Sequence, residues 1–279
     1  MAVAPERVLH VEWLDGRARG AYHEAHIPGA VLLDTDWLED GYPTWRLHSV
    51  EVLCTVLGSC GVDRDLPVSV HGSDLVAACR VWWLLRWLGA RRVTLHVEGL
   101  DRWRAAGNVC ESAVNAPPAC TFAPEVQPWL RAGTMDVLDV VAGRSDACLV
   151  DVRSHGEFMG ERSGYDYLDR RGRIPGAIHA PIAPLTELLR RDDRAGIAAH
   201  FRTCGVDVSH AGGVIFYCGG GWRSALACHA AHLLDVDARN YADGWCGWST
   251  DYVRDITAGG STPGWRQQAS DRPCVPGRN

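Results

Sequence analysis

The sequence predicts an α/β fold made of two similar domains, each with a parallel sheet flanked by helices. Three observations lead to this prediction. The chain has 279 residues, which is enough for two domains of ordinary size. Short patterns in the first half recur in the second half at a nearly constant offset. Within each half, strand-like runs alternate with helix-like segments, which is the pattern of parallel βαβ units.

The internal repeat consists of three patterns that occur twice in the same order. HIPGAV, beginning at His26, recurs as RIPGAI at Arg173, an offset of 147 residues. VSVHG, ending at Gly72, recurs as VIFYC, ending at Cys218, an offset of 146 residues. VEGLDRW recurs as YADGWCGW at an offset of 145 residues. Such agreement across half the chain indicates two homologous halves.

In the first half, the apolar run RVLHVEW at 7–13 predicts the first strand. The β-branched run VSVHG at 68–72 predicts a buried strand, and RRVTLHVEG at 91–99 predicts another. Between these two, VAACRVWWLLRWLG at 76–89 has apolar residues at helical spacing. Its tryptophans at 82, 83 and 87 are interpreted as packing residues rather than as a ligand platform.

The second half repeats this order. CLVDVRS at 148–154 and GGVIFYC at 212–218 predict strands, RSALACHAAHLLD at 223–235 predicts a helix, and DARNYADG at 237–244 predicts a further strand. The segment 108–128 carries four prolines and no periodicity, so it predicts a linker. The expected domains are therefore 1–107 and 129–279.

Composition narrows the classes of function. The formal net charge of −6 argues against unspecific binding of nucleic acid. Neither a signal-like start nor a long apolar run is evident, so a cytoplasmic protein is expected, without contact with a membrane. The 11 cysteines include no CxxC pair that would suggest zinc or a redox dithiol. Most of them are therefore expected to be inert core residues.

One cysteine stands apart because of its neighbours in the chain. Cys218 ends a predicted strand and is followed by Gly219, Gly220, Gly221, Trp222, Arg223 and Ser224, and the helix begins at the end of this loop, at Ser224. Successive glycines let several backbone N–H groups converge on one point, and the helix N-terminus and an arginine add positive charge. Such a loop stabilises a thiolate, and it can hold a second sulfur or an oxyanion.

The alternative is that Cys218 is one more core cysteine and that the glycines only turn the chain. The whole constellation favours function over that interpretation. In the first half Gly72 stands at the position of Cys218, so that half has no nucleophile. The sequence therefore predicts one active half and one scaffold half.

With these motifs in place, the chain resembles the tandem-domain rhodanese family, the thiosulfate and 3-mercaptopyruvate sulfurtransferases. HIPGAVLLDTDW, LVDVRSHGEFMGE, RGRIPGAI and YADGWCGWS resemble segments of that family in their expected order. The resemblance implies two domains, each with a five-stranded parallel sheet. It also implies a ping-pong cycle in which Cys218 takes a sulfane sulfur as a persulfide and passes it on, the residues from Gly219 onward hold that persulfide, and no metal or organic cofactor is needed.

Two competing functions remain at this point. Phosphatases and arsenate reductases of related fold resemble CX5R, whereas four residues separate Cys218 from Arg223 here, which favours sulfur transfer. A regulatory module without catalysis, which binds a partner, is the other alternative, and the intact loop argues against it.

The resemblance does not decide between the donors, although thiosulfate is placed slightly ahead of 3-mercaptopyruvate. Both are small anions, so arginines near the second Ile-Pro-Gly turn are expected to bind them, and Arg162 and Arg173 are the candidates. Glu157 stands where some animal members of the family carry an anion-binding arginine, so that contact is not expected here. The acceptor is expected to be cyanide, a thiol or a sulfur-carrier protein.

Overall fold

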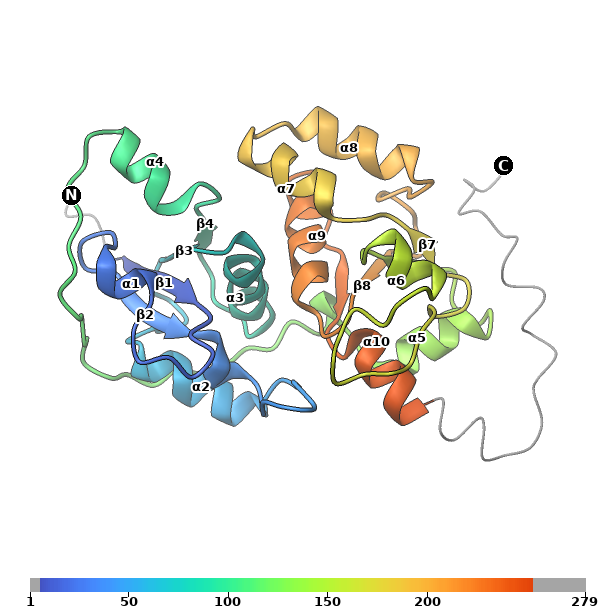
Figure 1. The fold of residues 1–279 in the computed structure, drawn as a ribbon, viewed down its shortest axis with the longest axis horizontal. Helices are drawn as coiled ribbons and strands as arrows, with labels where there is room; N and C mark the ends of the chain where they lie inside the picture. Colours follow the sequence, from blue (N-terminus) through green and yellow to red (C-terminus); the bar gives the residue numbers. More distant parts are fainter. Residues whose placement is uncertain (1–5, 253–279) are drawn as a thin grey trace. The chain divides into compact units, whose positions relative to one another are not determined.

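A computed structural model describes residues 6–252 of the chain (Figure 1). The contacts between residues divide the chain into two compact units, 1–127 and 128–279. The segment 108–127 packs on the first unit, because the Cys120 N–H donates to the Gly58 carbonyl and the Gln127 N–H donates to the Trp87 carbonyl. Most of the predicted linker is thus attached to one unit.

The first unit is built on a parallel sheet with the strand order β2-β1-β3-β4. Its elements are β1 (Arg7–Glu12), α1 (Ala21–Glu24), β2 (Val31–Asp34), η1 (Thr35–Leu38), α2 (Val50–Ser59), β3 (Val68–Gly72), α3 (Leu75–Trp87), β4 (Val93–Leu95) and α4 (Gly99–Ala105).

Helix α3 carries much of the first core. The Asp74 carboxylate caps its N-terminus by accepting from the N–H groups of Val76 and Ala77. Trp82 and Trp83 are almost fully buried, and the rings of Trp83 and Trp87 stack with centroids 5.6 Å apart. The interpretation of these tryptophans as packing residues is confirmed.

The second unit has a five-stranded parallel sheet with the order β5-β9-β8-β6-β7. Its elements are η2 (Pro128–Leu130), β5 (Arg131–Ala132), α5 (Thr134–Val141), β6 (Cys148–Asp151), α6 (His155–Met159), β7 (Ile178–His179), α7 (Ala183–Arg190), α8 (Arg194–Thr203), β8 (Val214–Tyr217), α9 (Trp222–His232), β9 (Arg239–Tyr241), α10 (Gly244–Gly247) and η3 (Trp248–Tyr252).

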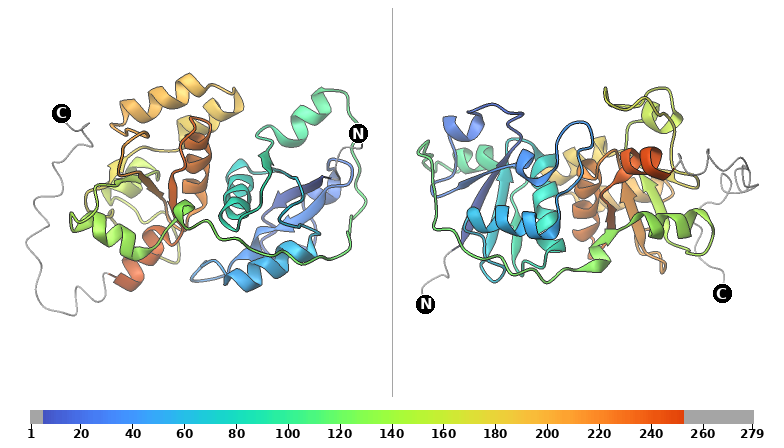
Figure 2. Two further views of the ribbon diagram at one scale, coloured as in Figure 1. Left: turned by 180° about the vertical axis from the view of Figure 1, so that it is seen from behind. Right: turned by 90° about the horizontal axis from the view of Figure 1, so that it is seen from below.

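The two sheets share their topology, as the repeat predicts. Strands β2, β1, β3 and β4 follow the order of β7, β6, β8 and β9. The first sheet has four strands within residues 6–127 rather than the expected five, because no described segment pairs with β4 in the way that β5 pairs with β9 in the second sheet. In the second unit, α7, α8 and α9 gather on one side of the sheet and α5 and α10 on the other (Figures 1 and 2).

Candidate active site

The candidate nucleophile lies between the middle strand of the second sheet and a buried helix. β8 ends at Tyr217, Cys218 comes next, and α9 begins at Trp222. Gly221 connects the loop to the helix with φ +85°, a left-handed conformation that favours glycine. A parallel strand that runs into a helix in this way directs the first N–H groups of the helix back toward the strand end.

The carbonyl groups of the loop are turned toward α10. The Trp245 N–H donates to the Cys218 carbonyl at 2.8 Å, and the Cys246 N–H donates to the Gly219 carbonyl at 2.9 Å. A side chain on Gly244 would overlap both of these carbonyls, so that position requires glycine. With its carbonyl oxygens bound on this side, the loop presents N–H groups to the sulfur.

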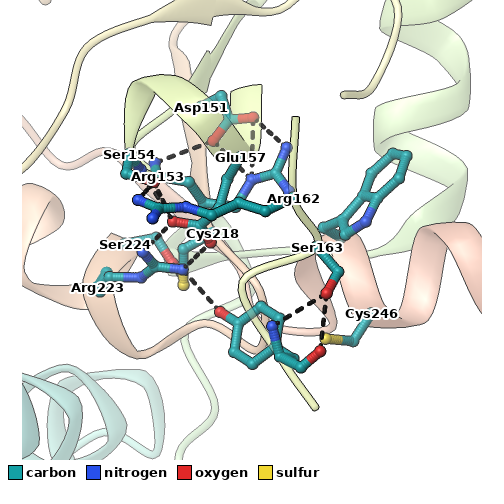
Figure 3. A network of polar contacts seen from close by, with 12 residues as sticks. Asp151, Arg153, Ser154, Glu157, Arg162, Ser163, Cys218, Arg223, Ser224 and Cys246 are labelled. Atoms are coloured by element: carbon teal, nitrogen blue, oxygen red, sulfur yellow. Dashed lines mark hydrogen bonds and ion pairs between the residues drawn. The ribbon is translucent and has the colours of Figure 1, made fainter. Parts of the chain in front are cut away.

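The Cys218 side chain is almost completely buried, with 1% of the residue exposed. Burial alone raises the pKa of its thiol, but the Arg223 charge, the hydroxyl and N–H of Ser224 and the N–H of Gly221 outweigh it and lower the pKa below the usual value. The Ser224 Oγ lies 3.5 Å from the Cys218 Sγ. The thiolate is therefore stabilised by four separate contributions, and Figure 3 shows Arg223 and Ser224 beside Cys218.

Asn240 fixes the orientation of Ser224. Its amide nitrogen donates to the Gly221 carbonyl at 2.9 Å, and its amide oxygen accepts from the Ser224 hydroxyl at 2.7 Å. Both side chains are fully buried. The strand β9 thus contributes a polar residue that holds the start of α9.

Arg223 forms a network with two residues that precede the second Ile-Pro-Gly turn. Its Nη1 and Nη2 donate to the two carboxylate oxygens of Glu157 at 2.8 and 2.7 Å, and Nη2 also donates to the Tyr165 hydroxyl at 2.7 Å. A side chain on Gly219 would overlap the Tyr165 hydroxyl, so the tyrosine lies directly against the loop. Burial is the main reason that the pKa of Tyr165 is raised far above its usual range.

A second buried ion pair supports the site. Arg153 donates to both carboxylate oxygens of Asp151 at the end of β6, and to the Gly172 carbonyl at 2.7 Å. The guanidinium also lies 5.1 Å from the ring of Trp245 in α10. This pair links the strand, the loop before the Ile-Pro-Gly turn and the helix that binds the Cys218 carbonyl.

The structure brings the predicted loop residues together beside Cys218, whereas the two predicted arginines contact residues in and next to α6. Gly219, Gly220, Gly221 and Trp222 continue from Cys218 into α9, and Ser224 lies beside the sulfur. Arg162 donates to the Ser154 hydroxyl at 3.1 Å, which places it next to Glu157. Arg173 lies over the ring of Phe158, 4.5 Å from its centroid, and donates to the Phe158 carbonyl.

Sequence reasoning did not predict the contacts of three residues in this network. Glu157 and Tyr165 bind Arg223, and Asn240 binds Ser224. Tyr165 lies in a polar loop without regular structure, and it is 58 residues from Arg223. Of the three, only Asn240 could have been recognised from the sequence, because an asparagine in the middle of a strand-like run suggests a buried polar role.

Within residues 6–252, the structure brings no three histidine, cysteine or acidic side chains together as a metal site would require. Helices in the same range are too short or too polar to cross a bilayer.

The chain is similar in sequence to a known domain family and to two named sulfurtransferases. The profile of the family described as Rhodanese-like domain matches residues 5–106 and 135–251. The thiosulfate sulfurtransferase YnjE of Escherichia coli strain K12 is 30% identical over 277 residues, covering 92% of this chain and 60% of that protein. The 3-mercaptopyruvate sulfurtransferase of the same strain is 29% identical over 238 residues, covering 81% of each chain. The chain thus spans less than two thirds of YnjE.

Solved structures show the same similarity. A persulfide form of EanB with ergothioneine matches with a TM-score of 0.79 and 28% identity, over 90% of this chain and 64% of that chain. The anaerobic ergothioneine biosynthesis enzyme from Chlorobium limicola, in complex with trimethyl histidine, matches with a TM-score of 0.76 and 28% identity. It covers 88% of this chain and 63% of that one.

Proposed function

Because the chain belongs to the rhodanese-like domain family, we propose that it is a sulfurtransferase in which Cys218 carries the transferred sulfur as a persulfide. The observation that supports this most directly is a buried thiol whose pKa is lowered at the junction of β8 and α9. The names of the relatives support the reaction class. The individual substrates are proposals for this chain.

In the first half of the reaction, the Cys218 thiolate attacks the sulfane sulfur of a small anionic donor. With thiosulfate, the sulfur–sulfur bond breaks, sulfite leaves with the bonding pair, and the sulfur stays on Cys218. With 3-mercaptopyruvate, the carbon–sulfur bond breaks, and the enolate of pyruvate leaves and takes up a proton. The N–H groups of Gly221 and Ser224 and the charge of Arg223 stabilise the anion before and after the transfer.

In the second half, an acceptor attacks the outer sulfur of the persulfide and the Cys218 thiolate leaves unchanged. Cyanide would give thiocyanate, and a thiol, including a cysteine thiol of a sulfur-carrier protein, would give a new persulfide. Every step transfers one sulfur atom to or from Cys218, and we propose that this transfer uses no metal or organic cofactor.

A second acceptor class is favoured by a specific observation. The Tyr165 hydroxyl lies against Gly219 and is bonded to Arg223, so a hydroxyl faces the start of the loop. Such a group can bond a ring nitrogen of an acceptor. The similar structures that contain trimethyl histidine or ergothioneine suggest an imidazole ring as that acceptor. Incubating the persulfide form with trimethyl histidine and measuring a mass gain of one sulfur on the small molecule tests this function.

The cysteines support a cytoplasmic setting for the same reaction. None of the ten cysteines within residues 6–252 is in a disulfide, and unoxidised thiols persist where the cell keeps them reduced. The remaining cysteine, Cys274, lies outside the described residues.

The central experiment measures the intact mass of the reduced protein after separate incubation with thiosulfate and 3-mercaptopyruvate, followed by peptide mapping and a cyanide chase. We expect one additional sulfur on Cys218, which cyanide removes. Cys218→Ser should gain none, whereas Cys54→Ser should behave as the wild type does. A sulfur that maps to another cysteine would contradict the assignment of Cys218. No mass gain with either donor would contradict the enzymatic function and favour a binding role. Turnover of p-nitrophenyl phosphate would favour a hydrolase.

A further inference from the structure

The positive charge beside the candidate nucleophile is already bound to a carboxylate. Arg223 is the cation that acts on the Cys218 sulfur, and its two terminal nitrogens are bonded to both oxygens of Glu157 at 2.7 and 2.8 Å. A third N–H contact goes to the Tyr165 hydroxyl. Bidentate pairing of this kind uses the face with which a guanidinium would otherwise bind an incoming anion.

Glu157 is held firmly in this position. Its side chain is 5% exposed, and its Oε2 also accepts from the N–H and the hydroxyl of Ser154 at 3.1 and 2.6 Å. Gly164 packs so closely that any side chain there would overlap the Glu157 carboxylate. Burial works against its charge, but the hydrogen bonds and charge of Arg223 and the bonds from Ser154 lower the pKa of Glu157 to about 2. The carboxylate is therefore ionised at neutral pH.

The other charges described around the site do not offset this carboxylate at the sulfur. Arg153 and Asp151 form a fully buried pair at 2.7 Å, so they cancel each other. Arg162 is exposed and donates to the Ser154 hydroxyl, so solvent screens its charge more strongly than that of the buried Glu157 carboxylate. With Cys218 ionised, the thiolate, Arg223 and Glu157 together carry one net negative charge.

We propose that Glu157 is a specificity-determining residue, which withholds Arg223 from incoming anions and so favours sulfur donors with one negative charge or none over dianionic donors. This inference rests on the proposed function and narrows the class of its donor. Thiosulfate is a dianion, whereas 3-mercaptopyruvate with its thiol protonated, an organic persulfide and hydrogen polysulfide carry fewer charges. The attack on thiosulfate brings three negative charges together, and the attack on 3-mercaptopyruvate brings two.

The size of the effect can be derived from Coulomb's law. One elementary charge about 6 to 10 Å away, at an effective dielectric constant of about 20, changes a rate or binding constant by about ten- to hundredfold. Removing the Glu157 charge should therefore favour a dianion over a monoanion by a factor of that order.

The first test compares the wild type with Glu157→Gln, which keeps the shape of the side chain and removes its charge. We expect the ratio of kcat/KM for thiosulfate to kcat/KM for 3-mercaptopyruvate to rise at least tenfold. The ratio cancels any change in the thiolate fraction of Cys218. Glu187→Gln is the matched control, because Glu187 is an exposed residue of α7 that pairs with Arg190, and its ratio should stay at the wild-type value. An unchanged ratio in Glu157→Gln would overturn the proposal.

A second readout does not depend on sulfur transfer. Iodoacetate and iodoacetamide react with the same thiolate and are similar in size, but only iodoacetate is an anion. We expect the ratio of their alkylation rates at Cys218, measured by peptide mapping, to rise about tenfold in Glu157→Gln. A rise in this ratio without turnover of either donor would refute the enzymatic function and leave the role of the charge standing. If the Glu157→Gln enzyme is active but its alkylation ratio is unchanged, the enzymatic function stands and the role of the Glu157 charge is refuted.

A third measurement uses the wild type alone, so that it holds even if the variant fails to fold. Raising the ionic strength from about 0.01 M to about 1 M shortens the Debye length from about 30 Å to about 3 Å. For a net negative site, the iodoacetate rate should rise relative to the iodoacetamide rate. The exposed Cys120 reports the effect of the net charge of the whole chain. A ratio that falls at Cys218, or that rises no more than at Cys120, would overturn the proposal.

Discussion

Ser224 has one hydroxyl proton and two acceptors within reach. The Asn240 oxygen lies at 2.7 Å and the Cys218 sulfur at 3.5 Å, and both acceptors are buried. When Cys218 is ionised, the hydroxyl stabilises the thiolate, as its contribution to the lowered pKa indicates. Ser224 therefore satisfies the buried Asn240 side chain and also lowers the pKa of Cys218.

We expect Ser224→Ala to raise the pKa of Cys218 and to slow its reaction with a neutral alkylating reagent at neutral pH by about tenfold, because a hydrogen bond to a charged group is lost. Ultraviolet absorbance of the thiolate as a function of pH checks the pKa directly. The variant should also lose about 1 to 3 kcal/mol of unfolding free energy, because the buried Asn240 oxygen loses its donor. Ser209→Ala, at an exposed turn, is the control, and equal titration curves for the two variants would contradict this role.

The loop from Cys218 to Gly221 functions as a unit with α10 and Tyr165. The carbonyl groups of Cys218 and Gly219 are bound by α10, and Gly219 lies against the Tyr165 ring. Position 219 of the loop therefore has no room for a side chain.

We expect Gly219→Ala to displace either Tyr165 or the loop, because the added methyl group would overlap the tyrosine hydroxyl and ring. Persulfide formation should fall at least tenfold, and the double variant with Tyr165→Ala should recover part of it. Gly133→Ala serves as the control, since its φ is −93° and the nearest atom to an added methyl group lies at 3.6 Å. Full activity of Gly219→Ala alone would show that the loop is not held by this contact.

The elements that sequence reasoning predicted are those with a strong local pattern. The strand expected at 68–72 is observed as β3 with the same bounds, and the helix expected at 76–89 is observed as α3 from Leu75 to Trp87. The run at 91–99 forms only the short strand β4, because Gly99 begins α4 there with a positive φ. The loop around Cys218 could be predicted from glycines, an arginine and a strand end that are adjacent in sequence.

The remainder of the site could not be predicted in this way. The contacts of Arg223 with Glu157 and Tyr165 span 66 and 58 residues, so no local pattern encodes them. They depend on how α6 and the segment after it pack against the start of α9. The choice of Arg162 and Arg173 as anion ligands stays a prediction, since it rests on residue type alone.

Considering the chain as a whole, the first unit contains a buried pair of histidines at the centre of its sheet. His10 in β1 and His71 in β3 lie edge to face with ring centroids 4.8 Å apart, and within residues 6–252 their ring nitrogens have no hydrogen-bond partner. Burial first, and neighbouring histidines second, lower the pKa of His10 to about 4 and that of His71 to about 3. The folded unit therefore holds both rings neutral.

This pair predicts the acid sensitivity of the first unit. Between the unfolded pKa of 6.5 and the folded values, the unfolded chain binds more protons, so stability falls as the pH falls through this window. The loss approaches about 1.4 kcal/mol per pH unit for each histidine. Hydrogen exchange of the intact chain at about pH 7 and about pH 5 should show β1 and β3 losing protection faster than β6 and β8.

His71→Phe should remove part of this pH dependence, since the repeat places the buried aromatic Tyr217 at the matching position of the second unit. His210→Gln, which changes a partly exposed histidine of the second unit, should leave it intact. Equal loss of protection in the two units of the wild type would contradict the assignment.

The N-terminus of α3 differs from that of α9 in what its first amides bind. Where α9 directs its first amides toward a reactive sulfur, the Asp74 carboxylate already accepts from the amides of Val76 and Ala77. A cysteine at Gly72 would also collide with the Val11 carbonyl. A cysteine placed at position 72 by a single substitution would therefore meet a carboxylate that already occupies the helix amides and a backbone carbonyl that leaves no room for its side chain. We expect Gly72→Cys alone to gain no persulfide, so the first unit would need several coordinated changes before it could carry sulfur.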